Sequence, residues 1–295
     1  MAPTEPVMVS AVSTPEPNHV FQEFAGPTFS GAFMNWHTLD VTISGAVATV
    51  TLNRPRVHNA FNETAIKELE HSFRMFGDRG EVRAIVLTGS GTTFCAGADL
   101  GWMKRMAEIP YEENFADAYR LATMLRTIYH CPKPVIARVQ GDAYGGGLGL
   151  IAAADIAIAS STAGFAFSEV KLGLMPAVIS PFVIQAVGSR VARRYFLTGE
   201  KFMAPEAHRI GLVHEVVTPD VLDAKLRSIV DQITQNGPQA VIQSKRLIQD
   251  IDLLSEKLSI DTAERIARLR GSEEAREGVQ AFLEKRRPGW IKEAP

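Results

Sequence analysis

The sequence predicts an α/β fold, in which strands and helices alternate to form a layered core and a mostly helical part follows. Three observations support this class. Residues 39–52 contain two segments of alternating apolar and polar residues that are typical of a β-hairpin. Between residues 62 and 159, short apolar runs alternate with segments of helical periodicity. From about residue 180 the pattern is mostly helical.

The first expected elements are the strands 39–43 and 46–52, joined by a turn at Ser44-Gly45. Asn62 is an expected N-cap, and helix-spaced apolar residues follow it as far as Phe76. Later breaks at Pro219, Pro238 and near Ser255 separate successive helices. The other expected elements of the core are a strand at 82–88, a helix at 112–130, a strand at 134–139, a small-residue helix at 146–154 and a strand at 156–159.

Composition excludes several classes of protein. The 295 residues are 46% hydrophobic and carry a net charge of −2, which is ordinary for a globular enzyme and lacks the basic excess of a nucleic-acid-binding protein. No apolar run approaches the roughly 18 residues of a membrane span, so we expect no membrane partner. Two cysteines do not make a disulfide framework, which favours a cytoplasmic location.

Residues 1–35 differ from the rest of the chain. They are rich in proline, serine and threonine, with no basic start, no long apolar run and no arginine, so neither a secretory signal nor a mitochondrial transit peptide is indicated. We expect a flexible N-terminal extension there, although a role at a subunit contact is an alternative. A core over residues 36–230 and a helical oligomerisation region over 231–295 would follow.

Two glycine-rich segments each follow an expected strand, at residues 94–100 and 141–147. Small residues let a ligand approach the backbone, and the N–H groups at a helix start have no partner within the helix. Two such turns side by side would form an oxyanion hole, although glycines that serve only packing explain the pattern too. Residues 147–152 match G-x-G-x-x-A, but the match lies inside an expected helix and only weakly indicates a dinucleotide site.

Several separated motifs together resemble the enoyl-CoA hydratase/isomerase (crotonase) superfamily over about residues 40–290. These are Asn53-Arg54-Pro55, Asn59-Ala60-Phe61, Leu87-Thr88-Gly89, Phe94-Cys95-Ala96-Gly97-Ala98-Asp99-Leu100, Lys133-Pro134-Val135-Ile136-Ala137, Gly145-Gly146-Gly147, Glu277-Gly278 and Phe282-Leu283-Glu284-Lys285-Arg286.

The resemblance implies a spiral of ββα units with a helical C-terminal trimerisation region, assembled as a homotrimer or a dimer of trimers. It implies an acyl-CoA substrate, no separate cofactor, and an oxyanion hole formed by the N–H groups of Ala98 and Gly146. Further residues are expected to bind the CoA part of the substrate, the last two from a neighbouring subunit: Arg56, Val57, Ala60, Ala96, Asp99, Leu100, Tyr144, Phe282 and Lys285.

The acid and base depart from the family pattern. Many family hydratases use two glutamates, one just after the triple glycine and one twenty positions later. This chain has Gly149 at the first position and Glu169 at the second. Glu169, which lies in an apolar run, is the expected proton carrier. A surface ion pair is the alternative role for this residue.

A lone carboxylate leaves two reactions open, hydration of the double bond and its Δ3,Δ2 isomerisation, and a non-catalytic scaffold is a third reading. Residues 168–181, 192–198 and 98–103 are similar to bacterial methylglutaconyl-CoA and carboxygeranoyl-CoA hydratases, which belong to leucine and terpenoid breakdown. We therefore favour a hydratase and a branched, carboxylated substrate.

Other candidate groups carry weaker signals. Cys95 follows the pattern of a small apolar filler better than that of a nucleophile, because no histidine partner is evident. The seven histidines show no metal-binding spacing, and no metal is expected. Lys104, Arg105 and Lys171 are the cations we consider for a substrate carboxylate, although such residues usually lie on solvated faces.

Overall fold

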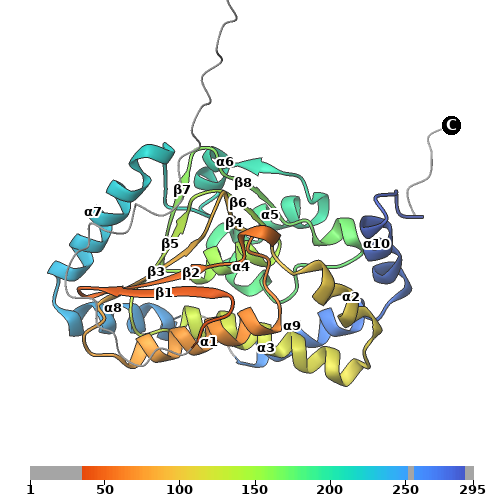
Figure 1. Ribbon diagram of the computed structural model, residues 1–295, viewed down its shortest axis with the longest axis horizontal. Coiled ribbons are helices and arrows are strands. Elements are labelled where there is room, and N and C mark those ends of the chain that lie inside the picture. The colour runs from red at the N-terminus through yellow and green to blue at the C-terminus, as the bar shows by residue number, and fades with distance from the viewer. Residues whose placement is uncertain (1–34, 252–255, 290–295) are drawn as a thin grey trace, which may run out of the picture.

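The computed structural model describes residues 35–251 and 256–289, so the predicted extension lies outside the described residues except for Asn35. Its two β-sheets are surrounded by helices, and the predicted α/β class is confirmed (Figure 1). The strands are β1 (Leu39–Ser44), β2 (Val47–Leu52), β3 (Ala84–Gly89), β4 (Thr93–Cys95), β5 (Val135–Val139), β6 (Asp142–Tyr144), β7 (Ile156–Ser160), β8 (Gly164–Ala166), β9 (Phe202–Met203) and β10 (Glu215–Val217).

The α-helices are α1 (Glu63–Asp78), α2 (Leu100–Glu108), α3 (Tyr111–Tyr129), α4 (Gly146–Ala153), α5 (Ser180–Thr198), α6 (Ala204–Arg209), α7 (Leu222–Gln235), α8 (Pro238–Ile251), α9 (Glu256–Arg270) and α10 (Glu273–Leu283). Short 3-10 helices are η1 (Pro55–Val57), η2 (Glu169–Leu172) and η3 (Pro219–Val221). Most of the predicted helices are present, with ends that differ by a residue or two, and Asn62 caps α1 by accepting a hydrogen bond from the Ala65 N–H at 3.1 Å.

The larger sheet has the strand order β1-β2-β3-β5-β7-β10. The predicted hairpin is present, with Leu39 opposite Leu52, and every other neighbouring pair in this sheet is parallel. The first four residues of β3 are all apolar, and their surroundings show why. Ile85 and Leu87 belong to the main core, whereas Ala84 and Val86 face a second core beneath α7. A strand buried on both faces reads as a continuous apolar run.

The smaller sheet, with the order β4-β6-β8-β9, was not predicted. β4 and β6 pair in parallel, and each overlaps the first residues of one of the two glycine-rich segments. The interpretation of residues 141–147 as a single turn was therefore wrong, because they include the strand β6. β9 and β10 also interrupt the part of the chain that was expected to be mostly helical.

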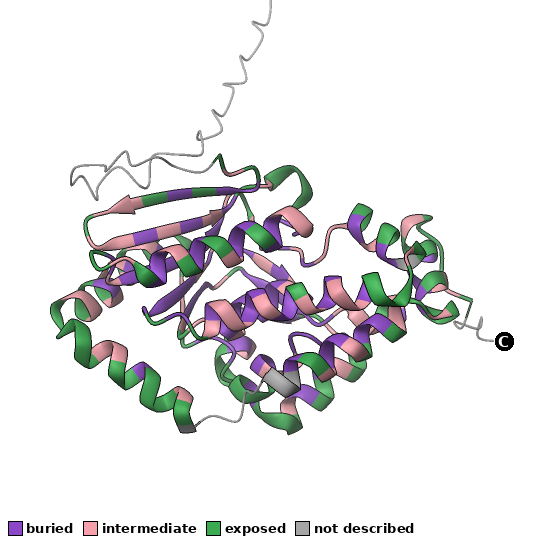
Figure 2. Cartoon of the chain, turned by 90° about the horizontal axis from the view of Figure 1, so that it is seen from below, coloured by how far each residue is buried: buried purple, intermediate pink, exposed green. Residues whose placement is uncertain are grey.

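The C-terminal helices cover one end of this same chain. α9 packs along α3, and α10 packs against η2 and α2. Figure 1 shows α2 and α10 together at one end of the molecule and α7 at the opposite end. The helices bury one side and expose the other, as amphipathic surface helices do (Figure 2). The proposed boundary at residue 231 stays a prediction.

Candidate active site

Two backbone segments meet at the edge of the smaller sheet, where β4 and β6 end. Gly97 lies against the second segment so closely that a Cβ atom there would come within 2.7 Å of the Tyr144 carbonyl oxygen and 3.3 Å of the Gly146 nitrogen. Its φ of +85° also favours glycine. A glycine at position 97 is therefore what allows the two segments to touch.

Each segment contributes an N–H group without a backbone acceptor among residues 35–251 and 256–289. Gly146 is the first residue of α4, and the first N–H groups of a helix have no acceptor within the helix. Ala98 is held by hydrogen bonds on both sides of it, from the Phe61 N–H to the Gly97 oxygen and from the Asp99 N–H to the Phe61 oxygen. Both residues line one cavity, as an oxyanion hole requires.

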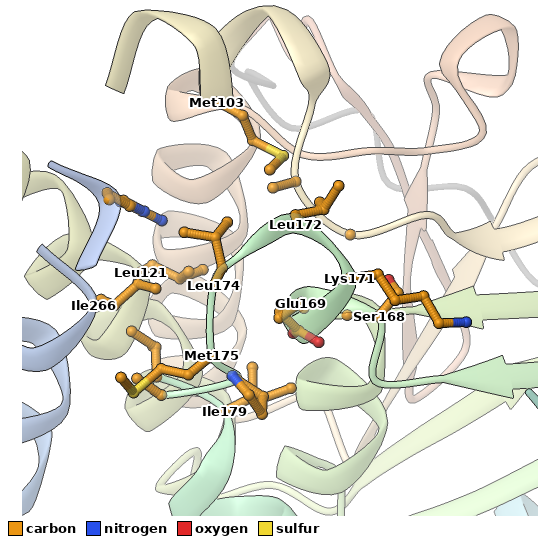
Figure 3. Close-up of a pocket in the computed structure, with 18 of the residues that line it drawn as sticks. Met103, Leu121, Ser168, Glu169, Lys171, Leu172, Leu174, Met175, Ile179 and Ile266 are labelled. Atoms are coloured by element: carbon orange, nitrogen blue, oxygen red, sulfur yellow. The ribbon is translucent and has the colours of Figure 1, made fainter. Parts of the chain in front are cut away.

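That cavity has a volume of about 280 Å³, and most of its lining is apolar. Figure 3 shows Glu169 with Leu121, Leu174 and Ile266 on one side and Ser168 and Lys171 on the other. The lining comes from Phe61, Ala96, Gly97, Ala98, Leu100, Met103, Leu121, Gly145, Gly146, Ser168, Glu169, Lys171, Leu172, Leu174, Met175, Pro176, Ala177, Val178, Ile179, Ile266, Arg270 and Phe282.

Glu169 brings a carboxylate to the same place from the start of η2. Although the residue as a whole is partly exposed, its Oε2 is shielded from solvent and has no hydrogen-bond partner among the described residues. A Cβ atom on Gly145 would lie 3.2 Å from its Oε1, so the carboxylate rests against the backbone that begins α4. Burial raises the pKa of Glu169 to about 7. The carboxylate is thus suited to exchange protons near neutral pH.

The pH dependence of activity should reflect this buried carboxylate. A residue that deprotonates water must be ionised, so kcat/KM for hydration is expected to fall about tenfold per pH unit below pH 7 and to level off above it. Initial rates between pH 5 and 9 test this. A limb centred near pH 4.5, the ordinary range of an exposed glutamate, would contradict the assignment.

At Gly149, where many family hydratases have their first glutamate, the space for a side chain is occupied by Ile179. A Cβ atom on Gly149 would lie 2.4 Å from Ile179 Cγ2, so even alanine does not fit without a shift. Ile179 itself lines the cavity (Figure 3). The absence of a carboxylate at 149 is therefore built into the packing of α4 against the residue before α5.

Among the residues expected to bind CoA, Ala96 and Leu100 line the cavity, whereas Ala60 is buried and does not line it. Arg56 and Val57 are exposed on η1. Whether these residues bind CoA stays a prediction.

Asp99 has a structural role. It accepts a hydrogen bond from the Trp102 N–H at 3.1 Å, as the N-cap of α2, and pairs with Arg54 at 2.9 Å. Burial opposes ionisation, but these two partners outweigh it and lower the pKa of Asp99. Asp99 therefore anchors the turn that carries Ala98.

Of the remaining residues predicted to bind CoA, one lines the cavity with its side chain and two do not. Phe282 lines the cavity of its own chain, from α10, whereas Lys285 is exposed and does not line it. The Tyr144 hydroxyl donates to Asp142 Oδ2 at 2.5 Å, and Lys201 pairs with the same oxygen at 2.9 Å. The structure thus brings the Tyr144 backbone, but not its side chain, to the oxyanion hole.

The surroundings of Cys95, Lys104, Arg105 and Lys171 argue against a catalytic or binding role for these residues. Cys95 is fully buried, and burial raises the pKa of its thiol to about 12, which suits a filler rather than a nucleophile. Arg105 pairs with Glu63 at 2.6 Å, and neither it nor Lys104 lines the cavity. Lys171 does line it, but its ammonium extends away from the Glu169 carboxylate (Figure 3).

Sequence reasoning missed Arg270, which lines the cavity from the end of α9. A lone arginine about a hundred residues after Glu169 carries no local signal of this placement. Within residues 35–251 and 256–289 no cluster of side chains is suited to a metal ion, and none of the helices there is long and apolar enough to cross a membrane.

The site places two backbone N–H groups and one buried carboxylate around a single cavity, an arrangement suited to stabilising negative charge on a carbonyl oxygen and to moving protons. The sequence profile described as "Enoyl-CoA hydratase/isomerase" matches residues 42–293. A probable enoyl-CoA hydratase of Rhodobacter capsulatus is 38% identical, with 86% of this chain and 98% of that protein covered.

Two further comparisons agree. A short-chain-enoyl-CoA hydratase of Clostridium acetobutylicum is 36% identical over 82% of this chain and 93% of that protein. The crystal structure of an enoyl-CoA hydratase from Shewanella pealeana superposes with a TM-score of 0.72 at 44% identity, covering 87% of this chain and 97% of that one. The chain therefore belongs to the enoyl-CoA hydratase/isomerase family, and the predicted crotonase fold is confirmed.

Proposed function

We propose that this protein is an enoyl-CoA hydratase, a hydro-lyase that adds water across the 2,3 double bond of an enoyl-CoA thioester. One observation carries the proposal: the buried carboxylate of Glu169 shares a cavity with two N–H donors, those of Ala98 and Gly146. The similarity to the enoyl-CoA hydratases of Clostridium acetobutylicum and Shewanella pealeana supports the same reaction.

The chemistry needs only these groups. The thioester oxygen accepts hydrogen bonds from the two N–H donors, which stabilise the negative charge that develops on it. Ionised Glu169 takes a proton from water as the water oxygen bonds to Cβ, and the π electrons of the double bond form the enolate. Protonated Glu169 then gives its proton to Cα, and the neutral 3-hydroxyacyl thioester leaves. The carboxylate returns to its starting state, so a second acid at position 149 is not required.

Isomerisation is the competing reaction within this family, and one specific observation favours it. A lone carboxylate that moves a proton between Cα and Cγ needs no positioned water, and the apolar Ile179 occupies the space beside Gly149. The two reactions use the same residues, so only the product distinguishes them.

For the acyl group we propose a branched chain that ends in a carboxylate, such as that of 3-methylglutaconyl-CoA. The similarity of residues 168–181 to hydratases of such substrates supports this choice. We also propose a homotrimer or a dimer of trimers. The exposed Leu247 and Ile248 on α8, which are 62% and 66% accessible, suit a subunit contact.

Product analysis tests the reaction. Purified protein is incubated separately with crotonyl-CoA, 3-methylglutaconyl-CoA and a 3-enoyl-CoA, and the products are identified by mass and ultraviolet absorption. We expect a gain of one water, with higher kcat/KM for the carboxylated substrate. A shift of the double bond without a change in mass would make the protein an isomerase, and no turnover of any of the three substrates would refute both reactions for these acyl groups and favour a non-catalytic scaffold.

A further inference from the structure

Arg270 is an unexpected residue in this cavity, whose lining is otherwise mostly apolar. It lies one helical turn after Ile266 on α9, so both side chains extend from the same face of that helix. Figure 3 shows Ile266 on the side of the cavity opposite Ser168 and Lys171. Arg270 thus places a cation at the end of the pocket formed by α3 and α9, away from the strand that leads to Glu169.

The surroundings of Arg270 hold it in place. Its guanidinium lies over the Trp102 ring, 5.3 Å from the centroid, and Trp102 is fully buried. Its Nη1 lies 3.4 Å from Asn114 Oδ1 and 3.4 Å from Asp117 Oδ2. Only 12% of the Arg270 side chain is accessible, against 5% for Asp117.

These contacts do not use the binding capacity of the guanidinium fully. Both hydrogen bonds leave from Nη1 and are longer than the 2.7–2.9 Å of a strong charge-assisted bond. A guanidinium has five N–H donors and binds a carboxylate through two parallel bonds. Asp117 already compensates this buried cation, but it does so through Nη1 alone, so the other N–H donors are left for an anion in the cavity, which would gain more there than in water.

We propose that Arg270 is a specificity-determining residue that binds a carboxylate at the far end of the acyl chain. This inference rests on the proposed function, because it assumes that the thioester lies at Ala98 and Gly146 and that the acyl chain extends toward α9. Arg270 thus replaces Lys104, Arg105 and Lys171 as the expected partner of the charged end of the substrate.

The cations considered from the sequence fit this role less well. Arg105 is exposed, pairs with Glu63 at 2.6 Å and does not line the cavity. Lys171 is exposed and its ammonium points away from Glu169 (Figure 3). Arg270, in contrast, is shielded from solvent and held in place by its neighbours, as selective recognition of an anion requires.

The test measures binding without turnover. Glutaryl-CoA and pentanoyl-CoA have acyl chains of equal length and differ in that only the first ends in a carboxylate. Dissociation constants for the full-length protein are measured by calorimetry. We expect Arg270→Met to weaken glutaryl-CoA binding on the order of 100-fold, as loss of a buried ionic contact does, while pentanoyl-CoA binding changes less than about threefold. Arg270→Lys should retain part of the preference.

Two further variants keep the test decisive. Arg270→Met leaves Asp117 buried without its cation, so Arg270→Met/Asp117→Asn repeats the measurement without that charge. Arg105→Met removes an arginine that does not line the cavity and should leave both constants unchanged. If the ratio of the two dissociation constants is unchanged in both Arg270→Met and Arg270→Met/Asp117→Asn, the inference is overturned, even if the protein hydrates enoyl-CoA. If the wild type binds glutaryl-CoA selectively through Arg270 but turns over no enoyl-CoA, only the hydratase proposal is refuted.

Discussion

Glu169→Gln is expected to lower kcat for hydration by about 10²- to 10⁴-fold, the usual contribution of a general acid–base group. Glutamine has nearly the same shape, but it can neither take the proton of the attacking water nor return one to Cα. The carboxylate rests against Gly145 rather than in a tight hydrogen-bond network, so the substitution should leave the surrounding backbone in place. Steady-state kinetics with an enoyl-CoA, together with the dissociation constant of CoA, measures both effects.

The stability of this variant gives an independent control. Burial raises the folded-state pKa of Glu169 to about 7, so ionisation disfavours the folded state between pH 4.5 and 7. Stability contributed by the neutral form is present below pH 4.5 and lost by pH 7. Glu169→Gln should therefore unfold at a higher temperature than the wild type at pH 8, with the difference vanishing below pH 4.5. Retained activity, or lower stability at pH 8, would show that Glu169 has another role.

Gly146→Ala is expected to lower kcat by about 10²-fold, the cost of losing one oxyanion-hole donor. A Cβ atom at this position would lie 2.3 Å from Phe61 Cζ, so the aromatic ring or the start of α4 has to move. A shift of α4 would displace the Gly146 N–H from the thioester oxygen. The expected signature is a fall in kcat with little change in KM, because the contact strengthens in the transition state.

A second substitution separates this effect from general damage to the fold. Phe61→Leu removes the ring atom that the new Cβ would meet, so Gly146→Ala/Phe61→Leu should recover activity relative to Gly146→Ala alone. The double-mutant cycle compares kcat for the four proteins, with thermal unfolding as a control for folding. If Gly146→Ala alone is as active as the wild type, the Gly146 N–H is not a donor to the transition state.

Much of the core architecture could be predicted, because hydrophobic periodicity is a local property. The hairpin of β1 and β2, the strand β5 and the helices α1 and α3 lie where alternation and helical spacing indicate them. The smaller sheet was missed for the same reason. β4, β6 and β8 have three residues each, which is too short for any period to appear, and pairing between distant segments forms them.

The candidate site divides in a similar way. Glu169, Ala98 and Gly146 were proposed from motifs, and the structure brings all three to one cavity. The reason for the glycine at 149 was not visible, because Ile179 contacts it from thirty residues away. The sequence by itself determined which backbone segments and which carboxylate belong to the candidate site, since short motifs encode them. Only the tertiary structure decided that Arg270 lines the same cavity, because the packing of α9 on α3 has no local signature in the chain.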